Sequence, residues 1–128
     1  VAGTQQFGVG PHTDFGMLTV LSQDDVGGLH VENVDGHWIK APPIKDTLIV
    51  NIGDLLTRWT NGEFHSASHR VINTSDQNRL SLVLAYDPNP ETNIDAKTLF
   101  PEASDCAEPI TCGEYLDWRF SKAFAYRR

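Results

Sequence analysis

Two histidines and one aspartate have the residue types and spacing of a metal site. His12 and Asp14 are two positions apart, and in a strand such residues project from the same face. His69 follows after enough residues for several strands to bring a second imidazole back to the same point. Two imidazoles and one carboxylate on one face of an ion leave its other positions open, which is typical of non-heme Fe(II) centres. The spacing therefore predicts that His12, Asp14 and His69 bind one metal ion.

The elements that must position these ligands are mostly short strands. Runs rich in β-branched and aliphatic residues alternate with turn residues, a pattern typical of a sandwich or barrel. Asp35-Gly36 predicts a two-residue hairpin turn, and the continuous apolar run 48–52 predicts a strand buried on both faces. The predicted strands cover residues 17–21, 29–32, 38–39, 48–52, 66–72 and 79–86.

Two helices are expected at the periphery of these strands. Asp54 is predicted to be the N-cap of a short helix over residues 55–59. A capping box of Thr111 and Glu114 opens a C-terminal helix that is predicted to run to about residue 126. The apolar residues spaced four apart on one face of that helix are Leu116, Phe120 and Phe124.

The length and pattern predict a mainly β fold of the jelly-roll type, whose open mouth can hold a metal. With 128 residues, of which 40% are hydrophobic, the chain can fill one core. Residues 1–90 are expected to form that core. Residues 91–128 are expected to be an acidic loop and a helix packed on it.

The composition excludes some partners. A net charge of −7 argues against a nucleic-acid surface, which needs a basic face, although a local arginine can still bind an acidic small molecule. No apolar run approaches the length of a membrane span, and residues 1–7 do not resemble a signal peptide. The two cysteines, Cys106 and Cys112, are too few for a disulfide framework. A cytoplasmic location is therefore expected.

Several segments carry a resemblance to a known family. Pro11-His12-Thr13-Asp14-Phe15-Gly16 resembles the metal strand of Fe(II)/2-oxoglutarate-dependent dioxygenases, and the isopenicillin N synthase-like branch is the most similar. Further matching segments follow in the family's order, over about residues 8 to 90. They are residues 27–31, 38–43, 50–54, 59–62, 68–71 and 79–81.

The resemblance implies a double-stranded β-helix, cupin-like, with iron bound by His12, Asp14 and His69. It also implies that Arg79 and Ser81 hold the distal carboxylate of 2-oxoglutarate. The residue types support this role, because a guanidinium fork and a hydroxyl two positions apart suit a carboxylate. With O2, such a site couples oxidative decarboxylation of 2-oxoglutarate to hydroxylation, desaturation or cyclisation of a small organic substrate. No catalytic residue beyond the metal ligands is predicted.

The sequence departs from the family before His12, where the family has an N-terminal domain and a strand with a tyrosine that helps bind the co-substrate. The chain is therefore expected to be the C-terminal catalytic part, with the N-terminal part as a partner. Three alternatives stay open: a 2-oxoglutarate-independent iron oxidase of the same family, a zinc hydrolase, and an inactive metal-binding fragment. His30, His37 and His65 are expected at the surface or in hairpins.

Overall fold

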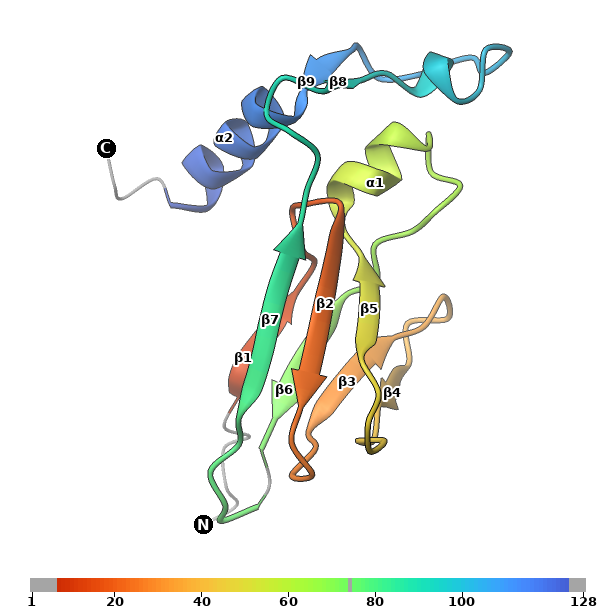
Figure 1. Cartoon of the computed structure of the whole chain (residues 1–128). Helices are drawn as coiled ribbons and strands as arrows, with labels where there is room; N and C mark the ends of the chain where they lie inside the picture. The colour runs from red at the N-terminus through yellow and green to blue at the C-terminus, as the bar shows by residue number, and fades with distance from the viewer. Residues whose placement is uncertain (1–6, 74, 125–128) are drawn as a thin grey trace.

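Two antiparallel sheets, one in front of the other, form the body of the molecule (Figure 1). The structure is a computed structural model and describes residues 7–73 and 75–124. In the four-stranded sheet the order is β1 (Phe7–His12), β6 (His69–Ile72), β3 (Leu29–Glu32) and β4 (Trp38–Lys40). In the three-stranded sheet it is β5 (Ile49–Ile52), β2 (Leu18–Gln23) and β7 (Ser81–Tyr86). A small third sheet pairs β8 (Asn93–Ile94) with β9 (Ile110–Thr111).

The hairpin between β3 and β4 differs from the prediction. The amide of Asn33 donates to the carbonyl of His37 at 2.9 Å, which closes a loop of Val34, Asp35 and Gly36. Gly36 has φ 78°, the left-handed conformation that glycine adopts readily. The prediction of a two-residue turn is therefore wrong, because a three-residue loop with a left-handed glycine fits these strands.

The outer face of the three-stranded sheet is apolar and exposed. Val20 lies between Val50 on β5 and Leu84 on β7 in the strand register, so the three side chains form one row. Val50 is 58% exposed and Leu84 61% exposed. We call Val20, Val50, Leu82 and Leu84 the outer apolar face. The prediction that residues 48–52 are buried on both faces is wrong, because β5 is an edge strand with one face uncovered in the described chain.

The short helix α1 (Asp54–Trp59) begins one residue earlier than predicted. Gly53 is its N-cap and makes no side-chain cap bond, so the assignment of Asp54 as the cap is wrong. The side chain of Asp54 instead contacts Thr13 and Arg119. The helix ends where Gly62, at φ 87°, donates its amide to the carbonyl of Thr57 at 2.8 Å.

The C-terminal helix α2 (Cys112–Ala123) begins with the predicted capping box. The Thr111 hydroxyl accepts from the Glu114 amide at 3.3 Å, and the Glu114 carboxylate accepts from the Thr111 amide at 3.1 Å. The helix ends at Ala123, and residue 126 lies outside the described residues. Among the described residues, neither helix is long and apolar enough to cross a membrane.

A cluster of buried apolar residues lies at the helical end of the sheets, where Figure 1 places both helices. Of the residues predicted to share an apolar face of α2, Leu116 packs against this cluster, whereas Phe120 is 49% exposed and Phe124 is 37% exposed. The short 3-10 turn η1 (Ala96–Thr98) follows β8. We call the buried residues of this cluster the cap cluster: Leu55, Ile94, Cys112 and Tyr115.

Candidate metal centre

The structure brings the three predicted ligands together. His12 ends β1 and His69 begins β6, and the two residues are opposite each other in the β1–β6 register. Asp14 lies two residues after the end of β1, in the turn toward β2. The Nε2 atoms of His12 and His69 lie 3.6 and 3.7 Å from Oδ1 of Asp14. Donor atoms on one ion, at about 2.0–2.2 Å each, are at most about 4.4 Å apart, so both pairs can share an ion.

The hydrogen bonds of the two imidazoles fit a metal as well. Nδ1 of His12 donates to the carbonyl of Gly10 at 2.8 Å, and Nδ1 of His69 donates to the carbonyl of Ala67 at 3.2 Å. A proton held on Nδ1 leaves the lone pair of Nε2 free to bind a metal. One donor atom from each of the three side chains lies within 4.8 Å of the others. The donor set therefore fits a two-histidine, one-carboxylate iron site.

A hydrogen bond to Oδ2 orients the carboxylate of Asp14. Nδ2 of Asn51 donates to Oδ2 at 2.7 Å, which leaves Oδ1 facing the imidazoles. Burial by itself raises the pKa of Asp14, but hydrogen bonds from Thr19 and Asn51 and the nearby His69 and His12 outweigh burial. The pKa of Asp14 therefore lies below its usual value, and the group is ionised, as a metal ligand must be.

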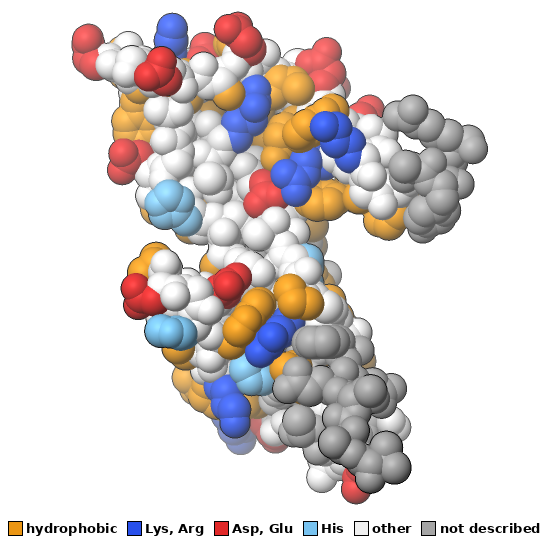
Figure 2. Space-filling view, turned by 180° about the vertical axis from the view of Figure 1, so that it is seen from behind, with side chains coloured by type: hydrophobic (Ala, Val, Ile, Leu, Met, Phe, Trp, Pro, Cys, Tyr) orange, Lys and Arg blue, Asp and Glu red, His pale blue; other side chains and the backbone are white. Residues whose placement is uncertain are grey.

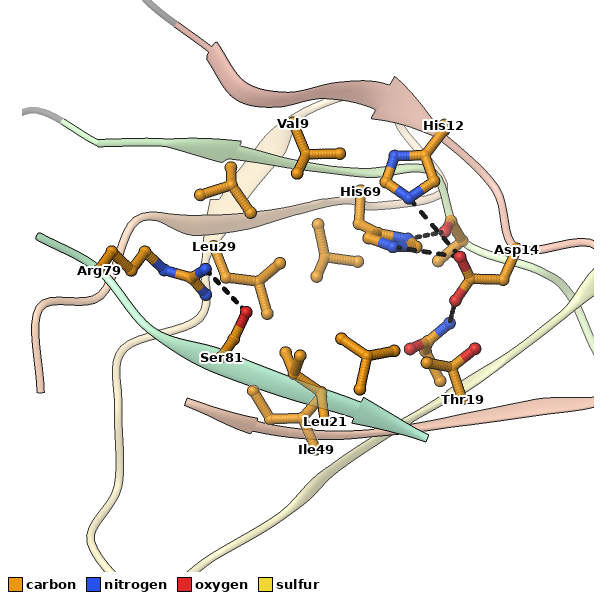
Figure 3. Close-up of a pocket in the computed structure, with 15 residues that line it drawn as sticks. Val9, His12, Asp14, Thr19, Leu21, Leu29, Ile49, His69, Arg79 and Ser81 are labelled. Carbon is orange, nitrogen blue, oxygen red and sulfur yellow. Dashed lines mark hydrogen bonds and ion pairs between the residues drawn. The ribbon is translucent and has the colours of Figure 1, made fainter. Parts of the chain in front are cut away.

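A cavity of about 150 Å³ extends from these ligands into the space between the two sheets. Figure 3 shows His12, Asp14 and His69 at one end of it and Arg79 with Ser81 at the other. The walls between the two ends are mostly aliphatic. They include Val9, Leu21, Leu29, Val31, Ile49, Val71 and Val83.

Arg79 is held in place by three hydrogen bonds. Its guanidinium donates to the carbonyl of Gly27 at 2.7 Å, to the hydroxyl of Ser81 at 3.2 Å and to Oε1 of Gln23 at 3.3 Å. The strand β7 begins at Ser81 rather than at Arg79 as predicted, yet both side chains line the pocket. A half-buried cation at the end of an apolar pocket suits a ligand carboxylate.

Sequence reasoning assigned no role in the site to Asn51 and Thr19, the two polar residues that hold Asp14. Asn51 and Thr19 are paired across β5 and β2, and both line the pocket. Each is a polar residue at an inward position of an apolar strand, a signal that was present in the sequence. The other histidines, His30, His37 and His65, do not line this pocket.

The turn that carries Asp14 is fastened to the start of α1. The amide of Asp54 donates to the carbonyl of Asp14 at 2.8 Å, and the amide of Leu55 donates to the carbonyl of Phe15 at 3.2 Å. A Cβ at position 53 would overlap the carbonyl oxygen of Gly16. Glycine at position 53 therefore lets the helix approach the metal turn closely.

Comparisons with known proteins agree with this geometry. The profile of the 2OG-Fe(II) oxygenase superfamily matches residues 3–88. A 2-oxoglutarate-dependent dioxygenase from Monascus ruber is 47% identical over 117 residues, which are 91% of this chain and 36% of that protein. A probable iron/ascorbate oxidoreductase from Dictyostelium discoideum is 55% identical over 85 residues, which are 66% of this chain and 23% of that protein.

Solved structures show the same fold. A full-length Neurospora crassa protein, solved in complex with alpha-KG, superposes with a TM-score of 0.84 at 37% identity over 94% of this chain and 39% of that chain. The match confirms the predicted double-stranded β-helix. This chain spans less than half the length of each of these relatives. Because the family profile covers most of the chain, the protein belongs to the 2OG-Fe(II) oxygenase superfamily.

Proposed function

We propose that this chain is the iron- and 2-oxoglutarate-binding part of an oxygenase that acts on a small organic substrate. The reaction couples oxidative decarboxylation of 2-oxoglutarate to hydroxylation, desaturation or cyclisation. One observation carries the proposal: a single pocket has a two-histidine, one-carboxylate cluster at one end and an arginine with a serine at the other. That arrangement suits a ligand with a metal-binding group at one end and a carboxylate at the other.

Each side chain has a defined task in this proposal. His12, Asp14 and His69 hold Fe(II) and leave part of its coordination sphere open. Bound there, iron supplies the O2 activation that links loss of CO2 from 2-oxoglutarate to oxidation of the substrate. Arg79 and Ser81 bind the distal carboxylate of 2-oxoglutarate and so orient its keto acid end toward the ligand cluster.

The apolar wall of the pocket supports the same function. Leu29 is 4% exposed and Val71 is 8% exposed, and both line the cavity between its two polar ends. An apolar wall excludes water and so strengthens the attraction between Arg79 and a carboxylate. The Neurospora crassa relative was solved with alpha-KG, and its likeness to this chain supports 2-oxoglutarate as the co-substrate.

The proposal includes the organisation of the chain. Residues 1–90 form the oxygenase core, and residues 91–128 form an acidic loop and a helix that pack on it. Ile94, Cys112 and Tyr115 contribute to the cap cluster, which supports this division for the residues through 124.

The proposal also covers partners and location. A small molecule is the substrate, the N-terminal part of a longer chain is a further partner, and neither nucleic acid nor a membrane is a partner. On the face seen in Figure 2, Lys and Arg are interspersed with Asp and Glu rather than gathered into a basic patch. The net charge of −7 agrees with this. Cys106 and Cys112 are both free thiols, which supports a cytoplasmic location.

The decisive experiment is an anaerobic titration of the Fe(II)-loaded protein with 2-oxoglutarate, followed by the metal-to-ligand absorption. We expect a saturable band in the parent protein and a much weaker affinity in Arg79→Ala. Equal affinities would reject the co-substrate assignment and favour the 2-oxoglutarate-independent alternative. Succinate formation on admission of O2 separates the two alternatives independently. Retention of Zn²⁺ with no Fe(II) binding would favour the zinc alternative.

A further inference from the structure

The residue between two metal ligands has its own contacts on the far side of the site. Thr13 separates His12 from Asp14 in the chain and does not line the pocket. Its hydroxyl donates to Oδ2 of Asp54 at 3.0 Å. The turn that carries His12 and Asp14 is therefore held, on the side away from the pocket, by the carboxylate of Asp54. The proposed reaction does not use this carboxylate.

That carboxylate also connects to the C-terminal helix. Nη2 of Arg119 lies 2.5 Å from the same Oδ2 atom, and the two side chains are only 26% and 17% exposed. The guanidinium of Arg119 lies over the ring of Phe15, 4.3 Å from the ring centroid, and donates to the hydroxyl of Tyr115 at 3.4 Å. Arg119 thus contacts both the side chain of Asp54 and the residue that follows Asp14.

Asp54 holds the turn at two points. Its side chain accepts from Thr13, while its backbone amide donates to the carbonyl of Asp14 at 2.8 Å. A shift of Asp54 would therefore move both residues and change the separation of the imidazole of His12 from the carboxylate of Asp14. Arg119 opposes such a shift, because a partly buried carboxylate with a charged partner is costly to displace.

We propose that Thr13, Asp54 and Arg119 form a positioning relay through which α2 sets the geometry and affinity of the metal site. None of the three is a catalytic residue, because each acts through the ligands His12 and Asp14. The inference rests on the proposed function, since it takes these ligands to bind the metal. Beyond that function, we infer that α2, which is distant in sequence, influences the metal affinity of the site from the side away from the pocket.

The test is a titration of the purified protein with Co²⁺ alone, read by the visible ligand-field absorption and, in parallel, by thermal unfolding. Thr13→Val removes the hydroxyl donor at nearly constant size, and we expect about tenfold weaker Co²⁺ binding with an altered spectrum. Thr13→Ser keeps the hydroxyl donor, and we expect it to keep the Co²⁺ affinity and the spectrum of the parent protein. Arg119→Ala is expected to act in the same direction as Thr13→Val.

Arg58→Ala is the matched control. Arg58 also ties α1 to the segment before α2, through a 2.5 Å hydrogen bond to the carbonyl of Glu108, and its guanidinium lies over the ring of Tyr115. Arg58 shares Tyr115 with Arg119, but neither of its two contacts is with Thr13, Asp54 or Arg119 itself. Arg58→Ala should therefore lower the melting temperature while leaving the Co²⁺ affinity and spectrum unchanged. The double variant of Thr13→Val and Arg119→Ala should bind Co²⁺ more tightly than multiplication of the two single losses predicts, because both changes act through Asp54.

The outcomes separate the two levels of the proposal. A parent protein that does not bind Co²⁺, or binds it equally well as His69→Ala, would reject the metal site itself. A parent that binds Co²⁺ through His69, with Thr13→Val unchanged in affinity and spectrum, would reject the relay and leave the metal site intact. Equal effects of Arg119→Ala and Arg58→Ala on Co²⁺ binding would also reject it.

Discussion

The cap cluster at the helical end and the pocket between the two sheets differ in how closely their side chains are packed. In the cap cluster, Leu55 is 0% exposed, Ile94 2% and Cys112 1%. Between the sheets, by contrast, the side chains surround a cavity of about 150 Å³ with polar groups at both ends. The most deeply buried side chains therefore come from the helical end, and the side chains proposed to bind iron and 2-oxoglutarate line the hollow.

This difference shows how a short chain can keep an open pocket. A fully packed space between the sheets would bury more apolar surface but leave no room for a ligand. The cap cluster draws on residues from α1, β8 and α2, so its packing does not depend on filling the pocket. The turn that carries Asp14 lies between the cap cluster and the pocket. Met17 packs against the cap cluster, while Asp14 lines the pocket.

The largest effect should come from a ligand in the hollow. His69→Ala leaves two ligands, which hold Fe(II) poorly, and we expect loss of measurable binding in metal analysis after anaerobic loading. The apo protein should keep its melting temperature, because the cap cluster is untouched. His65→Ala, a histidine in an exposed loop four residues earlier, is the matched control and should bind iron normally.

The next effect concerns the far end of the pocket. Arg79→Ala leaves the carboxylate of 2-oxoglutarate without its partner in an apolar pocket, a loss on the order of 3–5 kcal/mol. That corresponds to roughly a hundredfold to several-thousandfold weaker binding, measured by the anaerobic titration. Arg79→Lys should recover only part, since an ammonium lacks the fork. Iron binding that fell together with 2-oxoglutarate binding would contradict the separation of the two ends.

A third prediction concerns packing at the helical end. Leu55→Ala should reduce the free energy of unfolding by about 2–5 kcal/mol, the cost of a cavity at a fully buried leucine. Leu84→Ala makes the same chemical change on the outer apolar face, at 61% exposure, and should stay within about 0.5 kcal/mol. Urea unfolding of both variants measures the contrast. Similar losses would mean that the sheet face is as well packed as the cap.

The smallest effect is expected at Ser81. Ser81→Ala removes one hydrogen bond to the carboxylate and leaves Arg79 in place. The loss in 2-oxoglutarate binding should be about 0.5–1.5 kcal/mol, or up to about 3 kcal/mol because the partner is charged. Ser81→Thr keeps the hydroxyl and serves as the control. A loss as large as that of Arg79→Ala would show that the serine, rather than the arginine, dominates this end of the pocket.

The sequence was most informative about local hydrogen bonds and about residue types that suit a metal. The capping box of Thr111 and Glu114 was predicted correctly because both hydrogen bonds are local. The convergence of His12 with His69 was expected from their types, and the β1–β6 register places them opposite each other. Which residues bind the metal stays a prediction until iron binding is measured.

The failures involve contacts between distant segments. Asp54 looked like a helix cap because capping is the usual role of an aspartate at that place, but its carboxylate accepts instead from Thr13 and Arg119. Nothing in the local sequence indicates a partner on a helix so far along the chain. Residues 48–52 looked fully buried because periodicity cannot show that β5 is an edge strand.

The outer apolar face has a consequence for handling the protein. Leu82 and Leu84 stand 68% and 61% exposed on β7, which is an edge strand in the described chain. Apolar edge strands promote association between molecules, whereas the net charge of −7 makes molecules repel one another. Salt screens the repulsion but not the apolar attraction. Preparations of this chain should therefore stay monodisperse longest when they are dilute and low in salt.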